Sequence, residues 1–472
     1  MSPACVRPLF FACCAVLFAA SSQNAAAATL CVNPNGSGGC YKTISNAVSH
    51  AAANDVIKVA AGTYKEEVII GMPVSIIGAG ADASVIDATG LAHGIFVDGF
   101  DNPGLRDVTI AHLTVRNAQF EGILVVSAWD VIVRNNSILD NDKSSGLMFT
   151  GAAMGCPDQP GNGMYENDET GDCGGALHLV GVANSLISDN LIKGNADGVL
   201  ISDETAESHH NLFTHNTVTD NPLECGIVLA SHPPNGHTSP PFAPHFGVDN
   251  NVVADNVSNN NGVQIGGAGA GMFSDGMGQG RVSGNVIIHN ELKHNGLGGV
   301  ALHTHVGPVF GLPADDMSGN RIIDNDIEGN LPDQGDTATP GRVGININSG
   351  SGGSPVLGTV IARNRISDED VDVAINTPTD VDVHLNDLLG EGIGVADVCA
   401  FDKAPVCTGT IDATQNYWGC KKGPGGPGCT TTSGANITFN PWLKKSATDQ
   451  DDKHDQGDQD SDPPLAIQGR FR

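Results

Sequence analysis

Short hydrophobic segments, each headed by glycine, recur along the middle of the chain. They are Gly198-Val-Leu-Ile, Gly226-Ile-Val-Leu, Gly262-Val-Gln-Ile, Gly299-Val-Ala-Leu and Gly344-Ile-Asn-Ile. Their length of about four residues and their alternating side chains are typical of β-strands. Strands this short cannot form a core alone, so the pattern predicts coils that stack and pair in parallel.

A second pattern precedes these segments: Asn, any residue, an aliphatic residue, two polar residues and Asn. Clear copies begin at Asn190, Asn216, Asn290 and Asn325, and weaker copies begin at Asn136, Asn256, Asn364 and Asn386. Asparagine suits the corner of a coil, because it tolerates the left-handed conformation and its amide can bond to the Asn of the next coil. We therefore predict an all-β fold, a right-handed parallel β-helix (a solenoid) of about ten coils.

The two ends of the repeat differ from its middle. Ile44, Ala47 and Val48 have helical spacing, which predicts an N-terminal helical cap over the first coil. We place the β-helix domain at residues 29–445. Residues 446–472 are rich in Asp, and we expect a disordered acidic tail there, because such a segment buries too little apolar surface to fold.

The first 28 residues have the pattern of a secretory signal peptide. Arg7 precedes an apolar run from Leu9 to Ala20, and an alanine-rich stretch ends at Ala28. No later segment reaches the roughly 20 apolar residues of a membrane span. We expect a secreted or periplasmic protein with no membrane span.

Cysteine spacing agrees with export. Four close pairs predict four local disulfides, Cys31–Cys40, Cys156–Cys173, Cys399–Cys407 and Cys420–Cys429, and leave Cys225 as a buried free thiol. Zinc coordination is the alternative, which the lack of a Cys-x-x-Cys pair disfavours.

The repeats and both ends of the domain carry a resemblance to a known family. The opening Thr43-Ile-Ser-Asn-Ala-Val and Gly62-Thr-Tyr-Lys-Glu-Glu, with the ending Asn416-Tyr-Trp-Gly and Asn440-Pro-Trp, resemble right-handed parallel β-helix proteins of the pectin-lyase-like superfamily. The resemblance implies the fold over roughly residues 40–445. It leaves the function open, because that superfamily includes polysaccharide lyases, hydrolases, epimerases, esterases and binding proteins.

Composition and charge disfavour one fold class and one class of partner. The 472 residues include 61 Gly and 39 Asn with only 5% aromatics, which disfavours an all-helical protein. The formal net charge of −30 repels the phosphate backbone, so we expect no nucleic acid partner.

Alternation along the Gly-headed strands predicts which side chains face outward. If Val300 and Leu302 point inward, His303 and His305 point outward. We select these two histidines as candidate catalytic groups for proton transfer. Corresponding positions on neighbouring coils supply candidate substrate-binding residues: His178, Ser202, Asp203, Glu204, His232, Gln264, Asn346 and Asn348. Long insertions beside these strands, at 151–175, 231–248, 267–281 and 304–318, are expected to wall a cleft, or else to be decorative loops.

Two classes of function remain open. The first is an exported protein that binds or processes an extracellular polysaccharide in a cleft along one parallel sheet, as a lyase, hydrolase or epimerase if it is an enzyme. The second is a non-catalytic repeat protein, either a surface adhesion module or a periplasmic metal-handling factor. No cofactor is certain. A divalent metal remains open, with His303-x-His305 and His232 as one set of ligands that the sequence offers. We expect a monomer.

Overall fold

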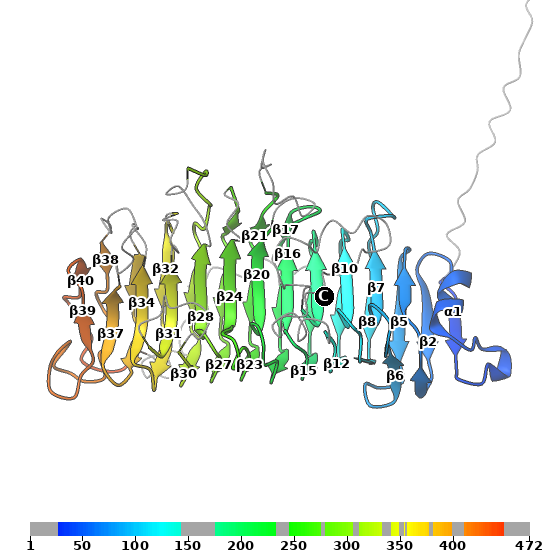
Figure 1. Ribbon diagram of the computed structural model, residues 1–472, viewed down its shortest axis with the longest axis horizontal. Helices are drawn as coiled ribbons and strands as arrows, with labels where there is room; N and C mark the ends of the chain where they lie inside the picture. The colour runs from blue at the N-terminus through cyan, green and yellow to red at the C-terminus, as the bar shows by residue number, and fades with distance from the viewer. Residues whose placement is uncertain are drawn as a thin grey trace, which may run out of the picture.

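Three long parallel sheets run the length of the molecule, and the chain passes from one sheet to the next as it winds (Figure 1). The computed structural model describes residues 27–142, 175–232, 245–274, 279–304, 311–332, 341–348, 354, 356–376, 381–398 and 410–447. Every strand pair in the described residues is parallel. The right-handed parallel β-helix predicted from the repeats is confirmed.

The 14-stranded sheet contains, in spatial order, β1 (Thr29–Val32), β2 (Asp55–Val59), β5 (Val74–Gly78), β8 (Thr109–Ala111), β11 (Ile132–Arg134), β14 (Leu186–Ser188), β18 (Leu212–Thr214), β22 (Val252–Ala254), β26 (Val286–Ile288), β29 (Arg321–Ile323), β32 (Thr359–Ala362), β35 (Val381–His384), β38 (Ile411–Asp412) and β40 (Ile437–Thr438). The 12-stranded sheet contains β4 (Val68–Ile70), β7 (Ile95–Asp98), β10 (Ile123–Val126), β13 (Leu177–Val180), β16 (Val199–Ser202), β20 (Ile227–Ser231), β24 (Ala268–Ser274), β28 (Gly298–Thr304), β31 (Val343–Asn348), β34 (Val371–Asn376), β37 (Ile393–Asp397) and β39 (Thr431–Ser433).

The 11-stranded sheet contains β3 (Gly62–Tyr64), β6 (Ser84–Asp87), β9 (Thr114–Arg116), β12 (Ser137–Leu139), β15 (Leu191–Lys193), β19 (Thr217–Thr219), β23 (Val257–Asn259), β27 (Glu291–Lys293), β30 (Asp326–Glu328), β33 (Arg365–Ser367) and β36 (Asp387–Leu389). A small sheet at one corner contains β17 (Ser208–His209), β21 (Val248–Asp249) and β25 (Val282–Ser283). Within the described residues, eleven coils supply a strand to each long sheet, from β2, β3 and β4 to β35, β36 and β37.

The core is a column of stacked aliphatic side chains. Within the 12-stranded sheet, Leu179, Ile201 and Leu229 occupy the same inward position on consecutive strands, and all three are fully buried. Each coil thus covers the apolar surface of the coil before it, which a single coil of three short strands could not do.

Asparagine ladders hold the corners of the coils. Asn290 accepts bonds from the backbone N–H and side-chain amide of Asn256, and donates its own amide to Asn325. The same pattern connects Asn136 to Asn416, and a parallel ladder connects Asn141 to Asn330. One expectation is wrong: the residue in the left-handed conformation is the one before the ladder asparagine, as at His289 (φ 56°), because the ladder residue itself turns its amide along the stack.

The N-terminal helical cap is confirmed. Helix α1 (Ile44–His50) begins after Thr43, whose hydroxyl accepts a bond from the backbone N–H of Asn46. Its buried side chains, Ile44, Ala47 and Val48, pack against the first coil.

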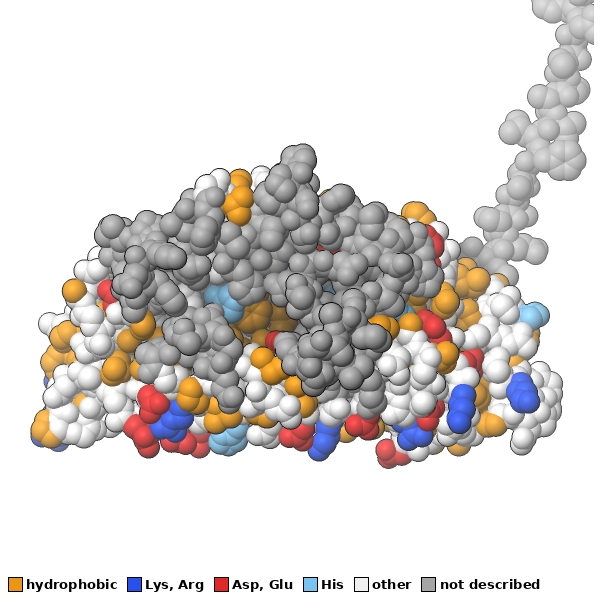
Figure 2. All heavy atoms as spheres, viewed as in Figure 1, with side chains coloured by type: hydrophobic (Ala, Val, Ile, Leu, Met, Phe, Trp, Pro, Cys, Tyr) orange, Lys and Arg blue, Asp and Glu red, His pale blue; other side chains and the backbone are white. Residues whose placement is uncertain are grey.

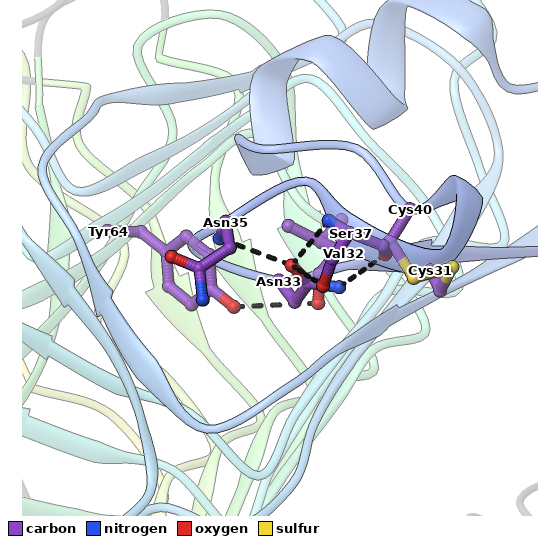
Figure 3. Close-up of a disulfide and its surroundings, with 7 residues drawn as sticks. All are labelled: Cys31, Val32, Asn33, Asn35, Ser37, Cys40 and Tyr64. Atoms are coloured by element: carbon purple, nitrogen blue, oxygen red, sulfur yellow. Dashed lines mark hydrogen bonds between the residues drawn. A yellow bond between two sulfur atoms is a disulfide. The ribbon is translucent and has the colours of Figure 1, made fainter.

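A disulfide closes the loop before this helix (Figure 3). Cys31 and Cys40 are bonded, and between them Asn33 accepts from the backbone N–H groups of Asn35 and Ser37. The loop includes a short 3₁₀ helix, η1 (Ser37–Gly39), and Tyr64 donates its hydroxyl to the carbonyl of Val32. The loop is therefore fixed both covalently and by its own hydrogen bonds.

Some of the remaining predicted cysteine pairs lie in the described residues and others do not. The Cys420–Cys429 disulfide is present, and Cys225 is buried and free of a disulfide. The pairs Cys156–Cys173 and Cys399–Cys407 lie outside the described residues, as do residues 1–26 of the expected signal peptide and 448–472 of the expected tail. Ser446 and Ala447 hydrogen-bond to Asp387.

In the part of the chain that the structure describes, no helix has the length and hydrophobicity needed to cross a membrane.

Two expectations about strands and insertions are wrong. Residues 262–265 form a turn, and the strand of that coil is β24, which occupies part of the expected insertion 267–281. Register with β20 and β28 decides this, because Met272 pairs with Leu229 and Leu302 and fills the core position. Insertion 151–175 leads into β13 rather than following a strand of the 12-stranded sheet.

Candidate active site

The outward face of the 12-stranded sheet carries two rows of side chains across its coils. One row contains Ser202, Ala230, Phe273, His303, Asn348 and Asn376. The next row contains His178, Leu200, Val228, Gly271, Ala301, Asn346 and Ala374. Between consecutive strands the spacing is about 4.8 Å, so each row is a regular ladder.

Polar groups gather along β7 to β20 and on the residues that directly precede or follow these strands. This buried polar cluster comprises His93, Glu121, His178, Ser202, Asp203, Glu204, Ser231, His232 and His245, each at most 8% exposed. Histidine atoms reach the surface near the middle of the molecule, beside hydrophobic atoms (Figure 2). Buried ionisable groups are costly, so such a concentration indicates a function or a network of mutual bonds.

One half of the cluster is a chain of four side chains. Glu121 Oε2 lies 2.6 Å from Nδ1 of His93, and its Oε1 lies 3.6 Å from Nδ1 of His178. The opposite nitrogen of His178, Nε2, lies 2.9 Å from the hydroxyl of Ser202. Glu121 thus lies between two imidazoles, and His178 connects it to the next strand.

The other half is organised by Asp203, directly after β16. Its Oδ1 accepts from the backbone N–H of His232 at 2.8 Å, and its Oδ2 accepts from Gly247 N at 2.5 Å and from the Ser231 hydroxyl at 3.1 Å. His232 Nδ1 lies 2.8 Å from Oε1 of Glu204. Asp203 therefore fixes the backbone of His232 while Glu204 orients its ring.

Burial changes the protonation of both halves. Burial, together with the charge of Glu204, raises the pKa of Asp203 to about 7. Burial, followed by the nearby His232 and His93, lowers the pKa of His178 to about 3. His178 is therefore a neutral imidazole at neutral pH, and its partner Ser202 directly precedes Asp203, which places the two halves side by side.

His303 lies apart from this cluster. Its ring packs against Phe273, with centroids 4.4 Å apart, and two strand spacings, about 10 Å, separate it from the row position of Ala230. Asn346 and Asn348 lie on the next strand, where Asn348 accepts from the amide of Asn376 at 3.2 Å. The structure brings His178, Ser202, Asp203, Glu204 and His232 together, and leaves His303, Asn346 and Asn348 on a neighbouring stretch of the same face.

Two predicted site residues do not join either group. Gln264 is exposed on the turn before β24, because Gly271 occupies its expected row position, so its placement on the outward face is corrected. His305 lies outside the described residues.

Sequence reasoning missed His93 and Glu121. Each directly precedes the glycine that begins a strand, at Gly94 and Gly122. These glycines are required by close packing: a Cβ on Gly94 would come within 2.2 Å of a Val115 methyl carbon. A polar residue immediately before a Gly-headed strand is the signal that could have identified them.

The buried polar cluster does not form a three-ligand metal site within the described ranges. There, the sole group of three ligand atoms close enough to share an ion is Asp382, His384 and Asp412, on the 14-stranded sheet.

Comparison with known proteins agrees with the architecture. The family described as right-handed β-helix region matches residues 76–239. Comparison with curated proteins finds no match. A GH87 α-1,3-glucanase catalytic domain in complex with nigerose is similar at 12% identity, over 83% of this chain and 68% of that chain, with a TM-score of 0.50.

Two further solved structures are similar over most of this chain. The A-module of mannuronan C-5 epimerase AlgE4 from Azotobacter vinelandii has 15% identity, covers 85% of this chain and 93% of its own, and has a TM-score of 0.45. The catalytic unit of a GH87 α-1,3-glucanase from Streptomyces thermodiastaticus has 15% identity, covers 85% of this chain and 66% of its own, and has a TM-score of 0.46. At these identities the similarity shows the fold alone.

Proposed function

We propose that this chain, a right-handed parallel β-helix protein of the pectin-lyase-like superfamily, binds and hydrolyses an extracellular polysaccharide on the outward face of its 12-stranded sheet. The observation that carries the proposal is the buried polar cluster. It collects histidines and carboxyl groups from five consecutive coils on one face, with the pKa of Asp203 near 7 and that of His178 near 3. Separating the pKa values of neighbouring groups in this way is how sites assign acid and base roles.

The shape of this face favours a long substrate. Its rows extend beyond the cluster to Phe273, His303 and the asparagines Asn348 and Asn376, which offer an aromatic surface and hydrogen-bonding groups. An extended sugar chain would contact successive coils at about 4.8 Å intervals. The nigerose complex of a structurally similar glucanase domain supports a carbohydrate on this type of fold.

The charge of the face favours a neutral polysaccharide. None of the outward positions on the described strands of the 12-stranded sheet is Lys or Arg, and the whole chain has a net charge of −30. Lyases and epimerases remove a proton beside a uronate carboxylate, whose charge has to be neutralised. Hydrolysis of a neutral glycan therefore fits this surface better than elimination or epimerisation.

Within the cluster we assign proton transfer to His232. Its Nδ1 lies against Glu204 and its backbone N–H donates to Asp203, so two buried carboxyl groups fix the ring in place for proton transfer. His303, the candidate from the sequence, packs its ring against Phe273 on the neighbouring stretch of the same face. In this proposal His303 contacts the substrate. Export is supported by the Cys31–Cys40 and Cys420–Cys429 disulfides.

The test compares turnover and binding across a panel of neutral glucans and polyuronates. We expect new reducing ends from a neutral glycan, a loss of at least about 100-fold in kcat for His232→Gln, and weaker binding with a smaller loss of kcat for His303→Ala. His289→Gln changes a corner histidine next to a different sheet and serves as the control. Unsaturated products from a polyuronate would overturn the assignment to hydrolysis.

A second outcome distinguishes the non-catalytic alternative. Binding without turnover, unchanged by His232→Gln, would identify an adhesion or binding module. No response to any carbohydrate would contradict the proposal as a whole.

A further inference from the structure

A compact group of ligating side chains lies at the C-terminal end of the 14-stranded sheet, far along the stack from the buried polar cluster. Asp382 and His384 are two residues apart on β35 and point to the same outward face. Asp412, on the next strand β38, is the direct register partner of Asp382. Three potential ligands from two strands therefore meet at one place.

Their separations leave room for an ion rather than for hydrogen bonds. His384 Nε2 lies 3.9 Å from Asp382 Oδ1 and 3.9 Å from Asp412 Oδ2. All three ligand atoms lie within 4.8 Å of one another. A zinc-like ion about 2.0–2.2 Å from each donor spans such gaps with small side-chain adjustments.

The histidine is already oriented as a ligand. Its other nitrogen, Nδ1, lies 2.9 Å from the backbone carbonyl of Thr414. A carbonyl only accepts hydrogen bonds, so Nδ1 carries a proton, and Nε2 is the ring nitrogen that faces the two carboxylates. Asp412 is fixed as well, because its Oδ1 accepts from the backbone N–H of Thr414.

The two carboxylates at this place have His384 and Thr414 as their described partners. Asp382 and Asp412 are like charges directly opposite each other on paired strands, an arrangement that destabilises a sheet. No Lys or Arg of the described chain forms an ion pair with either carboxylate. In the preceding coil the equivalent outward positions are the apolar Val360 and Ala362, so the ligands appear only where the solenoid ends.

We propose that Asp382, His384 and Asp412 bind a divalent transition-metal ion of the zinc type, with water completing its coordination. Two carboxylates and one imidazole suit such an ion better than Ca²⁺, which takes six to eight oxygen ligands. The ion links β35 to β38, whose pairing comprises only two residue pairs, and so stabilises the terminal coils. This inference is independent of the proposed polysaccharide activity.

The test is calorimetric titration of the metal-stripped full chain with ZnCl₂ alone, followed by thermal unfolding with and without zinc. We expect one zinc per chain at this site, binding weakened at least about tenfold by His384→Gln or Asp412→Asn, and a zinc-dependent rise in Tm that both variants lose. All three ligands are at least partly exposed, so the metal-free variants should fold like the wild type, which circular dichroism checks.

A matched control exists on the same sheet. His289 also lies near two aspartates, but Asp255 faces its Nδ1 and Asp324 faces its Nε2, so they cannot share one ion with a single ring nitrogen. His289→Gln should leave zinc binding unchanged. Zinc stoichiometry and affinity unaltered by His384→Gln would overturn the proposal and place any binding elsewhere, as would a Tm that zinc raises equally in wild type and variant.

Discussion

A single ladder asparagine forms hydrogen bonds with the backbone of other residues as well as with its ladder neighbours. Asn290 donates its amide to the carbonyls of Val253 and Ile288 and to Asn325 Oδ1, and its oxygen accepts two bonds from Asn256. The turn at each corner interrupts the strand pairing, so these side-chain bonds replace backbone bonds that the corner cannot make. The amide is 2% exposed, and water cannot replace the bonds.

We therefore predict that Asn290→Ala lowers the free energy of unfolding by about 3–4 kcal/mol, because buried donors and acceptors lose their partner. Urea denaturation followed by circular dichroism measures the change. Thr219→Ala, on the strand surface of the coil two turns earlier, should change stability by less than about 0.5 kcal/mol. Equal effects of the two substitutions would show that the ladder contributes nothing specific.

Chemical repetition explains what could be predicted from sequence. The ladder copies at Asn190, Asn216, Asn290 and Asn325 were visible because one hydrogen-bonding role demands one residue type. Strands at Gly198, Gly226, Gly299 and Gly344 followed from alternation. The strand β24 was misplaced because Ala268-Gly-Ala-Gly-Met has weak strand propensity and owes its conformation to pairing with its neighbours. His93 and Glu121 were missed because their contacts cross between coils, and one sequence does not show such contacts.

One ladder ends on a carboxyl group instead of an asparagine. Glu369 Oε1 accepts from both the backbone N–H and the amide of Asn330, at 3.0 and 2.9 Å. Burial is the main cause that raises the pKa of Glu369 to about 7, and burial likewise raises the pKa of Asp372 well above its ordinary value. The coil that contains β33 and β34 thus holds two carboxyl groups that bind protons more tightly in the folded state than in the unfolded chain.

The raised pKa of Glu369 determines the direction in which the stability of the fold changes with pH. Since the folded pKa of Glu369 exceeds the unfolded value of about 4.5, its stabilising contribution is complete below that pH and is lost as the pH rises through about 7. We predict that Glu369→Gln, which keeps the acceptor for Asn330, reduces the loss of stability between pH 5 and pH 8 by about 1–3 kcal/mol. Denaturation at both pH values measures it, with the exposed Asp82→Asn as control. A variant with the pH dependence of the wild type would remove Glu369 as its source.

A stack of parallel coils has two open ends, and each end exposes unpaired strand edges and core side chains. At the N-terminus, β1 and helix α1 cover the first coil, and the Cys31–Cys40 disulfide fixes the loop between them. At the other end, β39, β40 and the Cys420–Cys429 loop close the stack, with Trp418 fully buried beneath. Small terminal elements therefore cover both open ends of the stack.

The cap should accordingly control association as well as stability. Ile44 is fully buried between α1 and the first coil, so Ile44→Asp places a charge in the core and should release the helix. We predict a loss of at least about 3 kcal/mol, together with oligomers or aggregates, because the exposed strand edge can pair with another molecule. Size-exclusion chromatography with light scattering and thermal unfolding measure both effects, and Ser49→Asp on the exposed side of the helix is the matched control. If Ile44→Asp lowered stability but left a monodisperse monomer, α1 would stabilise the first coil without protecting its edge.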